Sequence, residues 1–146
     1  MTNQFFVDNF KKKVPLDKIS VSKENLGTIP GFLFTSYWVP RTLKTLSLHD
    51  CSIKSISNEI TMLSVLKNLN LSKNQLQEIP DFFSELHSLK SIDFSSNQIS
   101  EIPEFFTNLT KLKLLNVIDN PLETIPNCIL HHSANFIHHN VNLTAK

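Results

Sequence analysis

Leucine recurs along most of this chain at a spacing of 23 residues. Leu43, Leu66, Leu89 and Leu112 mark this spacing, and each opens a stretch in which apolar and polar residues alternate. The stretches read "LKTLSL", "LKNLNL", "LKSIDF" and "LKLLNV". Alternation with a period of two is typical of a short strand that buries one face. The pattern therefore predicts one short strand in each unit.

A turn and a return segment follow each predicted strand. The corresponding text reads "CSIKSI", "NQLQEIP", "NQISEIP" and "NPLETIP", and "LDKISVSKENLGTIP" shows the same apolar spacing from Leu16 onward. The recurring proline lacks a backbone donor, which suits a short or irregular helical segment better than a regular helix. One unit is too small to bury its own apolar edge, so we expect stacked units that share one core.

Position nine of the unit is polar and falls where the chain leaves the strand. Asn74, Asn97 and Asn120 occupy it in three units, and Cys51 occupies it in another. A buried asparagine at this place can bond the main-chain groups that a turn leaves unpaired, so we expect a ladder of buried side chains. In the first unit Glu24 suits such a slot poorly, and the next residue, Asn25, is the candidate for the same role.

The unit "LKNLNLSKNQLQEIPDFFSELHS" resembles a leucine-rich repeat of the 23-residue intracellular type. Such repeats occur in Ras-associated scaffold proteins, in fungal-type adenylate cyclases and beside kinase or phosphatase domains. The resemblance implies an α/β fold: a curved solenoid with a short-stranded parallel sheet on its concave face, irregular or short helical convex segments, and a protein-binding role. It departs from the family pattern in a longer first unit, which contains "SYWVPRT", and in the missing proline after Ile56.

The repeats define the expected organisation of the chain. An N-terminal capping segment is expected at 1–15, and a degenerate C-terminal end at 135–146, to which Phe136 and Val141 could add a last strand. Five repeats are expected between them, at 16–42, 43–65, 66–88, 89–111 and 112–134.

Strand side chains that do not enter the core would face the concave side, where a partner would bind. Most are small and polar, but Leu114 and Ile118 are apolar at positions that are polar elsewhere. Either a terminal stretch covers this apolar pair or the pair anchors a partner. The candidate partner-binding residues are Thr45, Ser47, His49, Asp50, Asn68, Asn70, Ser72, Ser91, Asp93, Ser95, Leu114, Asn116 and Ile118.

Four lysines occupy the second position of successive units: Lys44, Lys67, Lys90 and Lys113. In a regular stack they would stand about 4.8 Å apart, one strand spacing. They would either favour an acidic partner or act as solvated lysines that block association at the sheet edge.

Composition and charge narrow the function. A net charge of +1 with interspersed acids and bases gives no overall field that would recruit nucleic acid or a membrane. Asp8 inside the first apolar stretch and the lysines after it are the reverse of a secretory signal. The two cysteines form no disulfide framework. We therefore expect a cytoplasmic protein.

Catalytic and metal sites are not expected. "HDC" at 49–51 joins a base, an acid and a thiol, but the register turns Cys51 into the core and His49 outward. The four histidines in "HHSANFIHH" at 131–139 have no acid or cysteine inside that stretch, so a solvated end of the solenoid is favoured over a metal site. Two glycines cannot form a glycine-rich phosphate loop. No cofactor is implied.

The sequence thus favours a non-catalytic protein-protein interaction module, a scaffold or adaptor in intracellular signalling. The resemblance implies another protein as partner, with a small GTPase or a signalling enzyme as candidates. One alternative is a regulatory repeat segment related to leucine-rich repeat kinases or phosphatases. Another is a membrane-surface or self-assembling protein, which would use the phenylalanines and lysines of residues 1–15 or the open C-terminal end.

Overall fold

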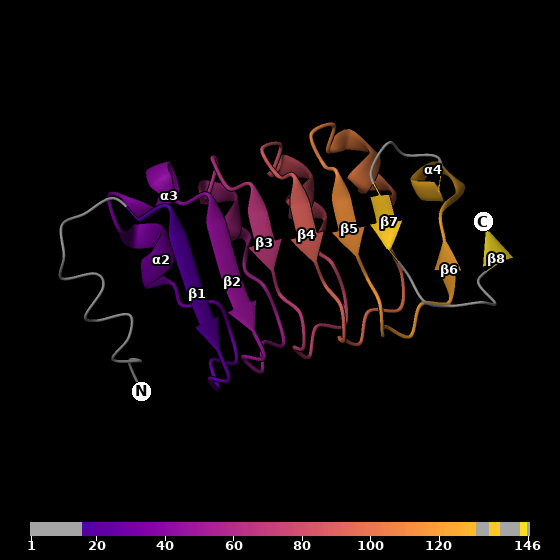
Figure 1. Cartoon of the computed structure of the whole chain (residues 1–146), viewed down its shortest axis with the longest axis horizontal. Helices are drawn as coiled ribbons and strands as arrows, with labels where there is room; N and C mark the ends of the chain where they lie inside the picture. Colours follow the sequence, from indigo (N-terminus) through magenta and orange to yellow (C-terminus); the bar gives the residue numbers. More distant parts are fainter. Residues whose placement is uncertain (1–15, 131–134, 138–143, 146) are drawn as a thin grey trace.

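The computed structural model describes the backbone of residues 16–130, 135–137 and 144–145, and side chains over 16–129. Its main feature is a parallel sheet of six strands in the order β1-β2-β3-β4-β5-β7 (Figure 1). These strands are β1 (Lys18–Ser22), β2 (Thr45–His49), β3 (Asn68–Asn70), β4 (Ser91–Asp93), β5 (Leu114–Asn116) and β7 (Asn135–Ile137). A second small sheet pairs β6 (Thr124–Ile125) with β8 (Thr144–Ala145).

Short helical segments lie behind the sheet and return the chain to the start of the next strand (Figure 1). They are α2 (Phe32–Thr35), α3 (Val39–Thr42), η1 (Asn58–Met62), η2 (Asp81–Glu85), η3 (Glu104–Asn108) and α4 (Asn127–Leu130), of which the η segments are 3-10 helices. Pro80 and Pro103 stand in extended conformation directly before η2 and η3, where their fixed φ angle suits a helix start. The predicted short helical segments are confirmed.

The core is a stack of equivalent side chains from successive repeats. Leu46, Leu69, Ile92 and Leu115 are register partners on adjacent strands, and all four are buried. Phe83 and Phe106 on η2 and η3 close the other side of this core. The predicted inward positions are therefore correct, and so is the predicted solenoid with a parallel sheet.

The predicted asparagine ladder is present and spans neighbouring repeats. Asn74, Asn97 and Asn120 are buried. The amide nitrogen of Asn97 donates to the carbonyls of Leu71 at 3.0 Å and Phe94 at 2.9 Å, so it joins its own repeat to the one before. The Leu71 carbonyl also accepts from Asn74 at 2.9 Å, and the Phe94 carbonyl also accepts from Asn120 at 2.9 Å, so the ladder holds each turn against its neighbour.

The first two repeats fill the same position differently. Cys51 is buried, and its thiol donates to the carbonyls of Val21 at 3.6 Å and His49 at 3.4 Å, as expected for a small weak donor. Glu24 and Asn25 are both exposed. The expectation that Asn25 replaces the buried asparagine is wrong, because the turn after β1 keeps both polar side chains in solvent.

The turn after each strand has one further regular feature, a left-handed residue at the eighth position of the repeat. The φ angles there lie between 54° and 59°, at Lys23, Asp50, Lys73, Ser96 and Asp119. Left-handed backbone is unfavourable for residues other than glycine, and aspartate tolerates it better than most. The eighth position therefore reverses the chain before the ninth position, which is buried in every repeat but the first.

At the C-terminal end, β7 extends the sheet beyond β5. Phe136 pairs in register with Leu115, so the predicted last strand is confirmed at that residue. Val141 and the predicted capping segment at 1–15 lie outside the described residues, as do His131, His132, His138 and His139.

Candidate protein-binding face

The predicted contact residues lie on β2 to β5 and in the turns that follow them. Asp50 and Asn68 are exposed and most of the others are half-buried. Ser72 differs, because only 5% of it is exposed. Against the prediction that Ser72 contacts a partner, a side chain so deeply covered presents almost no surface to one.

Ser72 instead connects two neighbours on this face. Its hydroxyl donates to Oδ1 of Asn70 at 2.6 Å, and the same oxygen accepts the backbone N–H of Ser72 at 2.9 Å. Nδ1 of His49 lies 2.8 Å from the Ser72 hydroxyl. Because the single hydroxyl proton is already given to Asn70, Nδ1 of His49 must be the donor of this last bond. In the neutral imidazole Nε2 is then an acceptor.

The same local arrangement recurs in the next repeats. Oδ1 of Asp93 accepts the hydroxyl of Ser95 at 2.6 Å and its backbone N–H at 2.9 Å. Oδ1 of Asn116 accepts the backbone N–H of Ile118 at 3.2 Å. The fifth residue of each of these repeats therefore closes the turn at the end of its strand. One carboxylate oxygen of Asp93 is engaged in this way, and the other can receive a donor from a partner.

Another contact links neighbouring strands at the start of this face. The amide nitrogen of Asn68 donates to the hydroxyl of Thr45 at 3.2 Å. Asn68 is exposed, so its side chain stays accessible to a partner. The strand face is thus a surface of polar groups that are held in place by each other.

Leu114 and Ile118 interrupt this polar surface. Both are half-buried, in contrast to Leu115 and Val117, which are buried in the core. β7 pairs with the outer side of β5, and Asn135 is the register partner of Leu114. The apolar pair therefore lies within the sheet and not at its last edge, while part of each side chain stays in contact with solvent.

Sequence reasoning missed an exposed aromatic pair beside α3. Tyr37 is 65% exposed and Trp38 is 43% exposed, and their rings meet edge to face with centroids 4.9 Å apart. The guanidinium carbon of Arg41 lies 4.7 Å from the Tyr37 ring centroid. The signal in the sequence was the adjacent tyrosine and tryptophan inside the inserted "SYWVPRT", an unusual composition for a solvent-facing segment.

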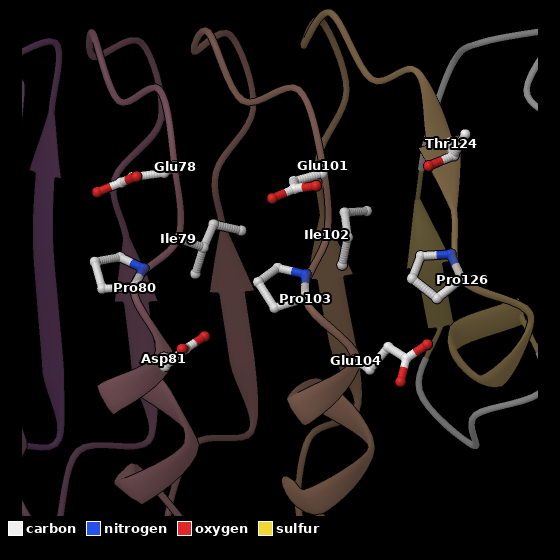
Figure 2. A pocket seen from close by; sticks show the side chains of 10 residues that line it. All are labelled: Glu78, Ile79, Pro80, Asp81, Glu101, Ile102, Pro103, Glu104, Thr124 and Pro126. Carbon is white, nitrogen blue, oxygen red and sulfur yellow. The ribbon is translucent and has the colours of Figure 1, made fainter. Parts of the chain in front are cut away.

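The return segments form a hollow of about 520 Å³ (Figure 2). Residues 78–81 and 101–104 line it, together with Thr124 and Pro126. Figure 2 shows Glu78 and Glu101 on one side of the prolines, and Asp81 and Glu104 on the other. The hollow is acidic because the same short segment is stacked twice.

The neighbouring histidine, aspartate and cysteine at 49–51 do not form a catalytic unit. His49 bonds Ser72, whereas the Cys51 thiol is directed to main-chain carbonyls. Burial is the main influence on the pKa of the Cys51 thiol and raises it. A buried protonated thiol is a poor nucleophile. Over the part of the chain that the structure describes, no group of three or more histidine, cysteine or acidic residues is arranged to hold a metal.

Comparison with known proteins identifies the class. Residues 41–99 match the family model described as leucine rich repeat. A leucine-rich repeat protein of Leptospira interrogans has a TM-score of 0.71 and 18% identity, over 93% of this chain and 39% of that one. The leucine-rich repeat ectodomain of the receptor kinase SOBIR1 from Arabidopsis thaliana has a TM-score of 0.68 and 28% identity, over 87% of this chain and 72% of that one.

A third structure is the leucine-rich repeat ectodomain of the Arabidopsis thaliana receptor kinase GASSHO1/SCHENGEN3. It has a TM-score of 0.63 and 27% identity, over 76% of this chain and 13% of that one. No curated protein sequence matches the chain. The repeats, the match over residues 41–99 and these neighbours show that this chain has the leucine-rich repeat fold, which supports a protein-protein interaction module. No helix among the described residues is long and apolar enough to span a bilayer.

Proposed function

We propose that this chain is a non-catalytic scaffold or adaptor that binds another protein on the concave face of its sheet. The observation that carries the proposal is the half-exposed apolar pair Leu114 and Ile118 in a surface that is otherwise polar. Partly exposed apolar side chains surrounded by polar groups are typical of the centre of a binding surface. Asn116 lies between them on the same strand face, with its Oδ1 fixed by Ile118.

The polar groups beside this anchor define what the partner should offer. Asp93 has one carboxylate oxygen beyond the one that Ser95 uses, and His49 presents Nε2 as an acceptor in its neutral form. Both favour donors such as N–H groups and cationic side chains. The partner surface should therefore carry an apolar residue for Leu114 and Ile118 and hydrogen-bond donors around it.

A protein partner agrees with what is found in one neighbour. The GASSHO1/SCHENGEN3 ectodomain was solved in complex with CASPARIAN STRIP INTEGRITY FACTOR 2. That complex concerns the neighbour, of which this chain matches 13% of the length. It supports a protein as the partner of this chain, without indicating which protein that is.

A cytoplasmic location and a partner in signalling, such as a small GTPase or a signalling enzyme, form part of the proposal. The resemblance to intracellular repeats supports the partner class. Cys51 and Cys128 are both free, which supports a reducing compartment.

The test is affinity capture from the native cell with wild-type chain, Leu114→Asp and Asp93→Lys, followed by affinity measurement with the recovered protein. Met62→Asp and Glu78→Lys are matched controls, because both residues are exposed and lie away from the strand face. We expect both strand-face variants to bind at least about tenfold more weakly than wild type, and the controls to bind within about twofold of it. Unchanged binding by folded Leu114→Asp and Asp93→Lys would contradict the proposal.

A further inference from the structure

One lysine directly precedes each of the adjacent strands β2 to β5. We call these four residues the lysine row: Lys44, Lys67, Lys90 and Lys113. Their backbones are hydrogen-bonded to one another, and the N–H of Lys67 donates to the carbonyl of Lys44 at 2.8 Å. Lys90 donates to Lys67 at 2.7 Å, and Lys113 donates to Lys90 at 2.8 Å. The four Cα atoms therefore follow one line across the sheet at about 4.8 Å per step, or roughly 14 Å in total.

The lysine row is bordered at one end by Asp17, whose backbone carbonyl accepts the N–H of Lys44 at 2.8 Å, and is uniformly basic from Lys44 to Lys113. Among the described residues, no acidic side chain forms an ion pair with any of the four ammonium groups. The residues next to each lysine in the sequence are leucine, threonine, asparagine or serine, and none is acidic. Arg41 stands three residues before Lys44, and Lys111 stands two residues before Lys113; both add further positive charge.

Four acidic side chains lie together on another surface of the molecule, whereas others, such as Asp50 and Asp93, belong to the strand face. Glu78, Asp81, Glu101 and Glu104 line the hollow in the return segments (Figure 2). The return segments thus carry an acidic hollow, and the strand starts carry a basic row. Like charges on adjacent strands repel each other, and this repulsion is relieved when an anionic partner binds.

We propose that the lysine row is a docking surface for an extended acidic segment of a partner protein. Successive carboxylates on one side of an extended chain repeat about every 6.7 Å, close enough to the lysine spacing for flexible lysine side chains to adjust. Lysine suits carboxylates on a mobile segment because its ammonium is a point charge without a fixed direction.

A single-stranded nucleic acid is the less favoured occupant of this row. Such sites combine positive charge with aromatic side chains on which bases stack. The positions following the four lysines are Thr45, Asn68, Ser91 and Leu114, so no aromatic ring alternates with the charges.

This inference extends the proposed function, because it assigns a charge to a second part of the partner. The docking proposal for the lysine row and the proposed function can fail separately. Leu114→Asp tests the apolar anchor with the natural partner, whereas the lysine row is tested below with a defined peptide.

The probe is a fluorescein-labelled peptide of about twelve residues that alternates glutamate and serine, roughly 40 Å when extended. Fluorescence anisotropy with the full chain, at about 50 mM and about 300 mM NaCl, measures its affinity. The test variant is Lys67→Glu/Lys90→Glu. The control is Lys54→Glu/Lys73→Glu, which changes the net charge equally at two exposed lysines beyond the other end of the strands.

We expect saturable binding of the peptide, with an affinity that falls at the higher salt concentration. The affinity should be at least about tenfold lower for Lys67→Glu/Lys90→Glu and within about twofold of wild type for the control. Circular dichroism confirms that both variants are folded. Absence of peptide binding, or equal loss in both variants, would overturn the proposal. Tighter binding of an oligothymidylate than of the acidic peptide, with the same dependence on Lys67 and Lys90, would also overturn it by assigning the row to nucleic acid.

Discussion

The side-chain oxygen of Asn74 accepts the backbone N–H of Ile53, 21 residues earlier in the chain, at 3.0 Å. The same oxygen accepts the N–H of Cys51 at 3.0 Å. The amide nitrogen of Asn74 donates to the carbonyls of Leu48 at 2.8 Å and Leu71 at 2.9 Å. One buried amide therefore satisfies main-chain groups of two successive repeats, and it fixes how the second repeat stacks on the first.

Replacing this amide should destabilise the chain strongly. Asn74→Ala leaves the two buried N–H groups of Cys51 and Ile53 without their partner, and each such group costs about 1 to 3 kcal/mol. We expect the free energy of unfolding to fall by about 3 kcal/mol or more, measured by urea denaturation. Asn25→Ala is the control, since Asn25 is exposed, and a change below about 0.5 kcal/mol is expected there. Equal stabilities of the two variants would contradict a structural role of the ladder.

Truncation of an inward strand residue tests the register. Ile92 is fully buried between its register partners Leu69 and Leu115. Ile92→Ala should lower the free energy of unfolding by about 2 to 5 kcal/mol and weaken the adjoining repeats, because it leaves a cavity in a shared core. Gln98→Ala, at an exposed position, should change stability by less than about 0.5 kcal/mol. A wild-type melting curve for Ile92→Ala would mean that the assigned register is wrong.

The repeat pattern made the fold predictable from the sequence. Leucine spacing and period-two alternation identify Leu69 and Ile92 as inward residues, because every unit must bury the same face against its neighbours. Asn74, Asn97 and Asn120 were predictable for a similar reason, since a turn that is repeated needs the same bonding group each time.

The binding face was harder to predict, because its details depend on contacts between repeats. Ser72 is buried under its bonds to Asn70 and His49, although its position in the strand pattern suggested exposure. Tyr37 and Trp38 fall in an insertion that has no equivalent in the other repeats, so no pattern could place them. The first turn, at Glu24 and Asn25, deviates for another reason. Among the predicted repeats the first one has a neighbour on one side only, and such repeats depart from the common pattern.

The two cysteines should differ in reactivity. Cys51 is buried and its thiol is bonded to main-chain carbonyls, whereas Cys128 is exposed. In the native chain a thiol reagent should modify Cys128 at least about tenfold faster than Cys51, because the thiolate of a buried cysteine is scarce and inaccessible. Single variants Cys51→Ala and Cys128→Ser assign each rate. Equally fast labelling of both sites would show that the turn after β2 opens readily.

Burial of Cys51 also predicts a dependence of stability on alkaline pH. The pKa of this thiol is raised chiefly by burial; the Glu24 backbone contact lowers it, and the charges of Asp50 and Glu24 raise it further. A raised folded-state pKa means that the stabilisation is complete below the unfolded-state value, about 8.5, and is lost as the pH rises above it.

Urea denaturation between about pH 7.5 and about pH 9.5 measures this loss. The wild-type chain should lose stability with pH more steeply than Cys51→Ala, by at most about 1.4 kcal/mol per pH unit, while Cys128→Ser should follow wild type. Identical slopes for wild type and Cys51→Ala would show that the Cys51 thiol ionises in the folded chain as it does in the unfolded one.

The central claim is that a partner protein binds on the strand face beside Leu114 and Ile118. Photo-crosslinking tests it most directly, with a photoreactive residue placed either at Asn116 on β5 or at Glu104 on η3, in the native cell. Our account predicts a crosslinked partner protein from position 116, abolished by Leu114→Asp, and none from position 104. A partner that crosslinks from position 104 and not from position 116 would contradict it.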